Sequence, residues 1–402
     1  MIRGSEEKQV EKLPSGAAIS AALSIGTIAL LILGIQPILL GALLEAHTAT
    51  LKGVGVIAMS EIVALGAGVV IGNTLFPLSA LRIIGITSAV FVASLDAATV
   101  FMSGDAHLTI VRSAAGLGEG GLLWLTTCII VRSSTPDRLT GIFLAAQTLA
   151  QAVLAAAYAG LVIPIGGWQA GYIVLAAITL MACLAVIWLP VGVAPLRSRA
   201  SSALKWTLAE ALPQGIVLLQ MAAIGALWAY LEPLGKRAGF GSEGAQAITA
   251  VVLLMQVLGG ASASFAVKRL DAVRVLAVGT ILLGAIPFAI HRLPPGSTLS
   301  FSLLCAAFGF VWLFLMPFQV SLAFRVDPAG RVAMLIPAMQ LLGTALGPIS
   351  ASLLVHEGDA GSVPLVSLAF ALAAAALLFL GRSRFRAGSA KVGTILQVGP
   401  SS

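Results

Sequence analysis

The chain has 402 residues, of which 59% are hydrophobic and only 10% are charged, and its formal net charge is +7. Soluble domains carry about 25% charged residues, so this composition excludes an ordinary soluble protein and indicates an integral membrane protein. The lysines and arginines are scattered among short polar loops. The positive charge therefore concerns orientation in the lipid bilayer, and we expect no nucleic-acid partner.

Apolar segments follow one another along the chain after a polar amino-terminal tail. Each is close to the roughly 20 residues that a helix needs to cross about 30 Å of hydrocarbon. The backbone must be helical there, because lipid offers no partners for its N–H and C=O groups. We predict an all-α integral membrane protein with twelve transmembrane helices, at about 17–40, 54–72, 83–103, 108–131, 139–163, 170–190, 211–232, 244–266, 273–290, 299–322, 332–355 and 363–381.

A longer polar segment divides the predicted helices into six and six. The predicted parts are a cytoplasmic tail (1–16), an N-terminal bundle (17–190), a cytoplasmic linker (191–210), a C-terminal bundle (211–381) and a second tail (382–402). The halves match at an offset near 193, where Arg138 and Gln147 repeat as Arg331 and Gln340. An even number of helices separates the halves, which predicts a parallel repeat with a binding site near the midplane, between the two bundles.

The basic residues predict the orientation of the chain. If the amino terminus is cytoplasmic, the inside segments hold 18 of the 23 lysines and arginines. The outside loops hold Lys52, Lys236, Arg237 and Arg292, and Arg112 lies within a predicted helix. This asymmetry follows the positive-inside rule for twelve helices. We expect both termini to be cytoplasmic. The Ala- and Gly-rich composition suggests the inner (plasma) membrane of a bacterium.

The fourth predicted helix carries an arginine and a glutamate seven residues apart, Arg112 and Glu119, with glycines between them. Residues seven apart lie two helical turns apart on one face. A charge at the bilayer centre costs roughly 2.5–3.5 kcal/mol on insertion scales, so this face must contact protein or water. The glycines allow another helix or a ligand to come close. The alternative is structural, with Arg112 only tying helix ends together.

Short motifs in and between the predicted helices resemble those of one large family. Arg112-Ser-Ala-Ala-Gly-Leu-Gly is similar to the fourth-helix pattern of the major facilitator superfamily, and Gly167-Trp168 before the sixth helix also resembles it. The segment from Gly72 to Arg82 lies where the family has a loop with glycine and aspartate, but here the aspartate is missing. The fifth helix lacks the Gly-Pro pair of the family's antiporters. The resemblance implies two pseudo-symmetric six-helix bundles and alternating access by rocking, usually driven by a proton gradient.

A proton-coupled carrier needs a carboxyl group whose pKa responds as water and solute enter or leave its surroundings. The candidates are Glu61, Asp96 and Glu119, in the second, third and fourth predicted helices. Glu119 lies nearest the middle of the membrane and is our first candidate. Asp96 and Arg112 lie at similar depth and could meet. A structural acid is the alternative for each, and it is the favoured interpretation of Glu61.

Neutral polar side chains within the predicted helices are candidates for contacting the solute. The glutamines are Gln36, Gln147, Gln220 and Gln340, of which Gln36 and Gln340 are preferred. Hydrogen bonding between helices is their alternative role. Trp228 and Tyr230 end the seventh predicted helix near the outside. They favour an anchor at the membrane interface, with an outer gate that contacts solute as the alternative.

These expectations favour a secondary active transporter of a small organic solute, coupled to protons, with efflux favoured over import. A proton-driven importer is the alternative. A membrane enzyme acting on lipid-linked substrates is a weaker one, because no His-Glu-x-x-His motif and no phosphate-cradling loop is present. One basic residue, Arg112, against the acids Glu61, Asp96 and Glu119 within the helices argues against a polyanionic solute. We expect a monomer without metal, cofactor or enzymatic activity, whose partners are the solute, protons and lipid.

Overall fold

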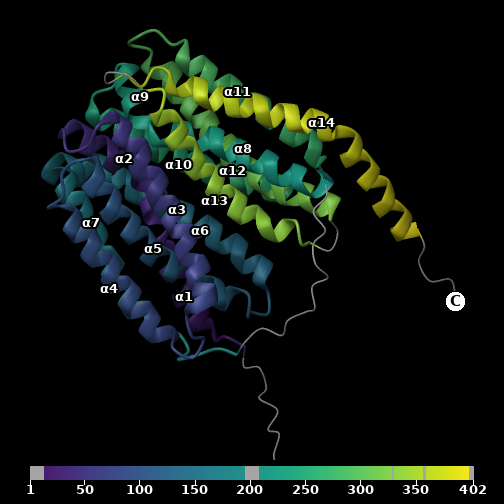
Figure 1. Ribbon diagram of the computed structural model, residues 1–402, viewed down its shortest axis with the longest axis horizontal. Coiled ribbons are helices and arrows are strands. Elements are labelled where there is room, and N and C mark those ends of the chain that lie inside the picture. The colour runs from purple at the N-terminus through teal and green to yellow at the C-terminus, as the bar shows by residue number, and fades with distance from the viewer. Residues whose placement is uncertain (1–12, 195–207, 328–329, 356–358, 398–402) are drawn as a thin grey trace, which may run out of the picture.

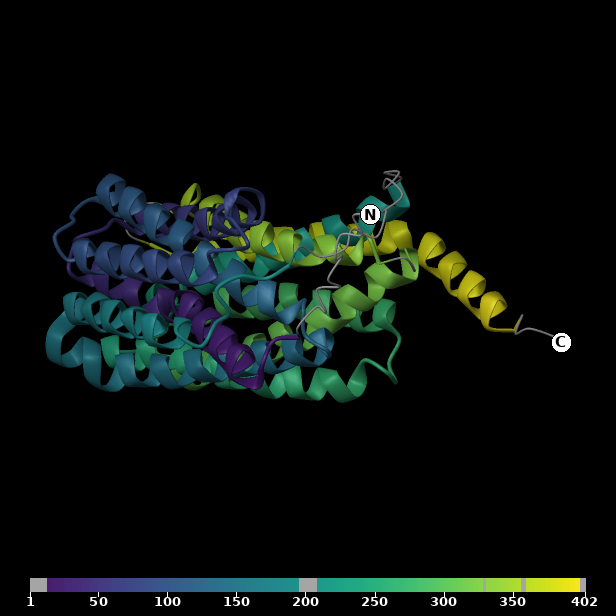
Figure 2. The same cartoon turned by 90° about the horizontal axis from the view of Figure 1, so that it is seen from below.

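Long apolar helices lie side by side in two bundles in the computed structural model (Figure 1, Figure 2). It describes residues 13–194, 208–327, 330–355 and 359–397. Much of the predicted tails and linker falls on 1–12, 195–207 and 398–402, outside the described residues. The predicted all-α fold class is confirmed for the described part of the chain.

The N-terminal bundle begins with a broken crossing. Its elements are α1 (Gly16–Ala29), α2 (Leu31–Glu45), α3 (Leu51–Leu75), α4 (Leu81–Thr99), α5 (Asp105–Ile130), α6 (Pro136–Ala157), the π-turn η1 (Tyr158–Val162) and α7 (Ile163–Val186). Helices α1 and α2 together form one 30-residue apolar stretch, interrupted at Leu30. The Gln151 side chain donates to the Leu30 carbonyl at 2.6 Å. The same carbonyl accepts the backbone N–H of Leu33 at 3.2 Å, so the bond from Gln151 adds a second donor and ties α6 to the break.

The apolar stretch from Arg138 to Val186 has 49 residues and forms two crossings. As one helix it would be about 70 Å long, more than twice the hydrocarbon thickness. Gly167 has φ +65° and ψ −166°, a conformation that favours glycine. The Tyr158 hydroxyl donates to the Gly171 carbonyl at 2.6 Å, although a straight helix would separate these residues by about 20 Å. The chain therefore folds back near Gly167, and the eleven apolar stretches found in the described residues provide twelve crossings.

The C-terminal bundle repeats this arrangement. Its elements are α8 (Leu208–Ala229), α9 (Leu231–Arg237), α10 (Ser242–Ala266), α11 (Ala272–His291), α12 (Thr298–Val326), the 3-10 turn η2 (Ala333–Leu335), α13 (Ile336–Ser352) and α14 (Val363–Gln397). Several boundaries differ from the prediction by three residues or more, among them the end of the first crossing, which lies at Glu45 rather than at 40. The seventh crossing ends at Ala229 and a short α9 follows it, and α14 continues past the predicted end at 381.

The two bundles meet at one end of the molecule. We call the end that carries Glu45 and Ser242 the far end, and the end where α1 begins and α14 finishes the terminal end. Near the far end, a Cβ added to Gly55 of α3 would overlap the Pro348 carbonyl of α13. Trp228 Nε1 donates to the Leu33 carbonyl of α2 at 3.0 Å. Figure 1 shows the bundles close together there and diverging toward the terminal end.

Candidate functional site

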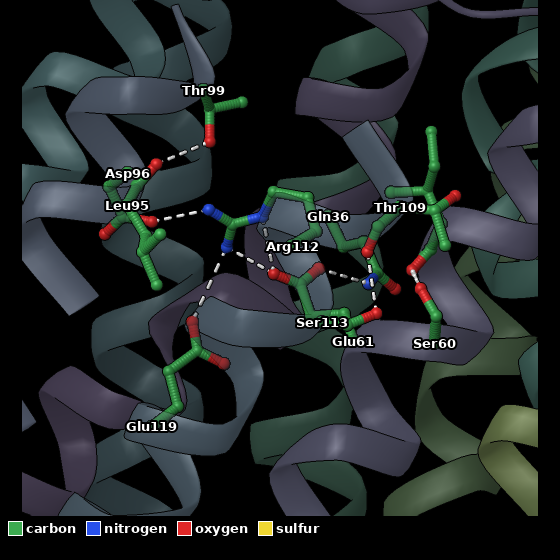
Figure 3. A network of polar contacts seen from close by, with 11 residues as sticks. Gln36, Ser60, Glu61, Leu95, Asp96, Thr99, Thr109, Arg112, Ser113 and Glu119 are labelled. Atoms are coloured by element: carbon green, nitrogen blue, oxygen red, sulfur yellow. Dashed lines mark hydrogen bonds and ion pairs between the residues drawn. The ribbon is translucent and has the colours of Figure 1, made fainter. Parts of the chain in front are cut away.

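Arg112 is the centre of a buried polar cluster in the N-terminal bundle (Figure 3). Its Nε donates to Glu61 Oε1 of α3 at 2.8 Å, and its Nη2 also contacts that oxygen. Its Nη1 donates to Asp96 Oδ1 of α4 at 2.6 Å, and its Nη2 lies 3.5 Å from Glu119 Oε1. One guanidinium on α5 thus reaches acids on α3, α4 and α5. We call Arg112, Glu61, Asp96 and Glu119 the Arg112 cluster.

The Arg112 cluster is sealed from solvent. Arg112 and Asp96 are 0% exposed, Glu61 1% and Glu119 2%. Gln36 of α2 donates to the second oxygen of Glu61 at 3.1 Å, so both Glu61 oxygens are engaged. The expected meeting of Asp96 with Arg112 is confirmed, and Glu61 is a partner of the same cation.

Glycines bring α3 and α5 close enough for these contacts. A Cβ added to Gly116 would overlap the backbone carbonyl of Glu61, and one added to Gly120 would overlap that of Leu65. Gly68 of α3 meets the Leu117 carbonyl in the same way. Small residues at such crossings let helix backbones approach in a membrane. The glycines near Arg112 therefore serve the packing of two helices that the guanidinium then joins.

Helix α7 covers the cluster with Tyr172, which follows the hairpin at Gly167. The Tyr172 ring centroid lies 5.0 Å from Arg112 Cζ, within the range of a cation–π contact. Tyr172 packs edge-to-face against Trp168, with ring centroids 6.4 Å apart. The rings of Tyr172 and Trp168 therefore cover the cluster on this side. Their position depends on the reversal of the chain at Gly167.

The Arg112 cluster holds three carboxyl groups and one guanidinium. With all four ionised, its net charge would be −2 in a site that water hardly reaches. Buried charges without compensation are costly, so such a site binds protons instead. Glu119 Oε2 and Asp96 Oδ2 are buried and have no hydrogen-bond partner among the described residues. The three carboxyl groups can therefore bind protons while they are buried and release them when solvent reaches them.

Four polar side chains form a chain of hydrogen bonds in the C-terminal bundle. Gln340 of α13 donates to Gln319 of α12 at 2.8 Å, and Gln319 donates to Gln220 of α8 at 2.9 Å. Gln220 donates to Thr280 of α11 at 2.6 Å. We call these four residues the amide chain. Gln220, Gln319 and Thr280 are buried, whereas Gln340 is half-buried and ends the chain.

The other side chains predicted to contact the solute lie outside both the Arg112 cluster and the amide chain. They are Gln147, Trp228 and Tyr230. Gln147 is half-buried, and its Oε1 has no partner in the described part of the chain. Trp228 is 2% exposed and Tyr230 is 0% exposed, so their interpretation as anchors at the membrane interface is wrong. Trp228 packs on Trp312, and Tyr230 lies against Gly55 of the opposite half. Both residues lie where the two bundles meet near the far end, and their contacts with α2 and α3 of the opposite half account for their burial.

Gln319 and Thr280 of the amide chain are not among the residues predicted from the sequence. An amide within an apolar span is the signal that selects the other glutamines, and it applies equally to Gln319. The described residues contain no group of three or more His, Cys, Asp or Glu side chains that could hold a metal ion.

Solved structures share this architecture. A bacterial homologue of the human lysosomal transporter Spinster, inward-facing and occupied, matches with a TM-score of 0.68 and 14% identity, over 92% of this chain and 97% of that chain. Its inward-facing, unoccupied form matches with a TM-score of 0.63 and 14% identity over the same shares. A point mutant of the nucleoside transporter NupG matches with a TM-score of 0.69 and 14% identity, over 90% of this chain and 99% of that chain.

No family model matches the sequence, and no curated protein matches it. The likeness in structure extends over nine-tenths of the chain, so it concerns the whole architecture of two bundles. The chain is a multi-pass membrane protein with the major facilitator fold.

Proposed function

We propose that this chain is a secondary active transporter, which moves a small organic solute by alternating access and couples that movement to protons. The observation that carries the proposal is the Arg112 cluster, where three buried acids share one cation. Transport proteins with the same fold support the proposal. Glu119 is the proposed proton carrier, with Asp96 and Glu61 as further acids and Arg112 as the cation that tunes them.

The proposed coupling follows from the cost of burying charge. In the sealed site, Arg112 compensates the acids that contact it most closely, and a proton neutralises Glu119. When rocking of the bundles admits water, the ionised form of Glu119 becomes less costly and the proton leaves. Intramembrane acids that pair with a cation and face the bundle interior are typical of proton pathways.

The solute is proposed to bind between the halves, where Gln147 of the first bundle and Gln340 of the second are half-buried. Gln36 is 1% exposed and donates to Glu61 in this state, so it is proposed to reach the solute only when the bundles rock. The hydrogen bond to Gln319 in the amide chain would hold the Gln340 side chain in place. Such a lining suits a neutral, cationic or amphiphilic solute that accepts and donates hydrogen bonds. Gln220, Trp228 and Tyr230 are then supports of the site rather than contacts, because they are buried within the protein.

The proposed location is the inner membrane of a bacterium, with both termini in the cytoplasm. In that orientation the far end faces outward, and the structure corresponds to a state closed to the outside. Efflux in exchange for protons is favoured over import. The chain is proposed to act as a monomer, without metal or cofactor.

Transport by the purified protein in proteoliposomes tests this function. A pH gradient is imposed, and a panel of neutral, cationic and amphiphilic solutes is screened for accumulation, counterflow and accompanying proton movement. We expect at least one solute to accumulate only with the gradient, and the direction of the effective gradient separates efflux from import. Counterflow without any response to pH would disprove proton coupling, and an absence of both counterflow and accumulation would disprove the carrier function.

A further inference from the structure

A second group of charged side chains lies at the far end, where the two halves touch. Glu232 belongs to α9, just beyond the span that ends at Ala229, and is 0% exposed. It packs against α2 of the other half, because a Cβ added to Gly41 would overlap its carboxyl group. Lys236 Nζ lies 3.1 Å from Glu232 Oε1, one turn along α9. An acid is thus buried in a contact that alternating access must open.

The ammonium of Lys236 is shared with a second acid from the opposite half. Its Nζ also lies 3.2 Å from Glu45 Oε2 of α2, and Ser242 of α10 donates to Glu45 Oε1 at 2.7 Å. The Glu45 side chain is 50% exposed, whereas that of Glu232 is 0% exposed. Solvent therefore stabilises the charge of Glu45, whereas Glu232 has one shared cation and no exposure to solvent. With all three ionised, the group carries net charge −1 at a buried interface.

The groups that face Glu232 offer little else to compensate its charge. Lys236 and Glu45 are the charged groups near it, and α10 contributes the neutral Gln246. Gln246 is 1% exposed, and no described residue donates a hydrogen bond to its Oε1. A protonated Glu232 could supply that donor. Burial raises the pKa of Glu232 to about 7, and Lys236 and a hydrogen bond from Gln246 oppose this shift only in part.

A pocket lies near this group. It has a volume of about 440 Å³ and lies at the far end between α2, α7 and α10. Its lining includes Glu45, which pairs with Lys236, Gln246, which neighbours Glu232, Ser242, and the exposed Glu243. The lining residues include no lysine, arginine or histidine. A proton could thus exchange with solvent over a short path once the interface loosens.

We propose that Glu232 is a second proton-binding site, separate from the Arg112 cluster, that takes up a proton when the far end closes and releases it when the far end opens. The inference rests on alternating access as proposed above, but not on the role of Glu119. In the open state Glu232 would leave Gly41 and become an ordinary hydrated acid. The closed state binds the proton more tightly, so by linkage closure is favoured at low pH and weakens as pH rises through about 7.

The test is the distance across the far end as a function of pH. Spin labels are placed at A106C on α5 and S300C on α12, which are exposed at the far end of opposite halves, after Cys128, Cys183 and Cys305 have been replaced by alanine. The full chain is measured in lipid nanodiscs from about pH 5 to about pH 9. We expect the ratio of closed to open molecules to fall at least about tenfold over this range. In Glu232→Gln the fall centred near pH 7 should be absent.

Three further variants distinguish proton binding at Glu232 from a purely structural latch and from titration of a different acid. Glu243→Gln, an exposed acid on the rim of the same pocket, should behave like the wild type. Lys236→Gln should move the midpoint to higher pH, because Glu232 then holds its proton more tightly, whereas loss of a merely structural latch would open the far end at every pH. Glu119→Gln should retain a response with its midpoint near pH 7, even where it abolishes driven transport.

Two results would overturn the proposal. One is a wild-type distance that does not change with pH, and the other is the same response in Glu232→Gln as in the wild type. If Glu232→Gln does not fold, the pH midpoint of Lys236→Gln tests the proposal by itself. A midpoint that moves to lower pH, or does not move, contradicts the proposal. A failure of Glu119→Gln to affect transport would count against the proposed function and leave this inference standing.

Discussion

Glu119 Oε1 lies 3.5 Å from Arg112 Nη2, two helical turns further along the same helix, and Glu119 Oε2 has no partner among the described residues. Asp96 and Glu61 hold the same guanidinium by bonds of 2.6 and 2.8 Å. Arg112 therefore compensates Glu119 less than either of the other acids. This relationship makes Glu119 the acid that is expected to hold a proton in the sealed site.

Glu119→Gln replaces the proposed proton carrier with a neutral side chain of the same size. We expect gradient-driven accumulation of solute to fall at least about tenfold, because no proton can be released at this position, while exchange of solute for solute continues. Both are measured in proteoliposomes with and without a pH gradient. Glu243→Gln, at an exposed position, is the control and should transport normally. Unchanged driven transport in Glu119→Gln would remove Glu119 from the mechanism.

Gly116→Ala tests whether the close crossing of α3 and α5 positions the Arg112 cluster. The added methyl group would overlap the Glu61 carbonyl, so the helices must separate and lengthen the bonds from Arg112 to Glu61. We expect a lower melting temperature in detergent and a several-fold loss of driven transport. Gly141→Ala on α6 is the matched control, because its Cβ would meet nothing within 4 Å. It should be neutral or slightly stabilising, since alanine is the better helix former. Equal behaviour of the two variants contradicts the role given to Gly116.

Gln340 and Gln319 should differ in their effect on transport if the amide chain supports a solute contact. Gln340 is half-buried at the end of the chain, and Gln319 is buried behind it. We expect Gln340→Ala to raise KM for the transported solute about tenfold with little change in maximal rate, because a contact to solute is lost. Gln319→Leu should lower protein stability as well, since it leaves the side-chain oxygen of Gln220 without its donor and the side-chain nitrogen of Gln340 without its acceptor. A fall in maximal rate alone in Gln340→Ala would place this residue outside the binding site.

The number and order of crossings could be predicted from the sequence because each rests on a local property. Apolar length sets the crossings, and Gly167 marks the reversal that divides a 49-residue stretch into two helices. The depth of a residue also follows from its position along a helix. This is why the contact between Asp96 and Arg112 was predictable, and it is confirmed at 2.6 Å.

What depth does not specify is which helix faces meet. Glu61 becomes a close partner of Arg112 because Gly116 and Gly120 draw α3 against α5, which is a property of the packed pair. Trp228 and Tyr230 lie at a helix end, where aromatic residues are common at the membrane interface. Their burial follows from the contact between the two halves, which joins segments about 195 residues apart along the chain.

Asp327 provides a test of stability at the terminal end, outside the spans. Between α12 and α13 its carboxylate accepts the backbone N–H groups of Arg331 at 2.8 Å and Val332 at 3.2 Å. It also pairs with the Arg331 guanidinium at 3.0 Å. The hydrogen bonds from Arg331 lower the pKa of Asp327 from its ordinary value. The ionised form therefore stabilises the fold at pH values above the ordinary pKa of 3.8, and this stabilisation is lost as pH falls through the lowered value.

Asp327→Asn should accordingly lower the melting temperature of the detergent-solubilised protein by a few degrees, about the effect of losing a helix cap, at neutral pH. The difference from the wild type should shrink below about pH 4, because the wild-type carboxylate is then being protonated as well. Melting curves of both proteins between about pH 3 and pH 8 measure this, with Glu243→Gln as an exposed acid that should follow the wild type. A difference that stays constant down to the lowest pH would show that the charge of Asp327 does not contribute, and that its size and shape account for the effect.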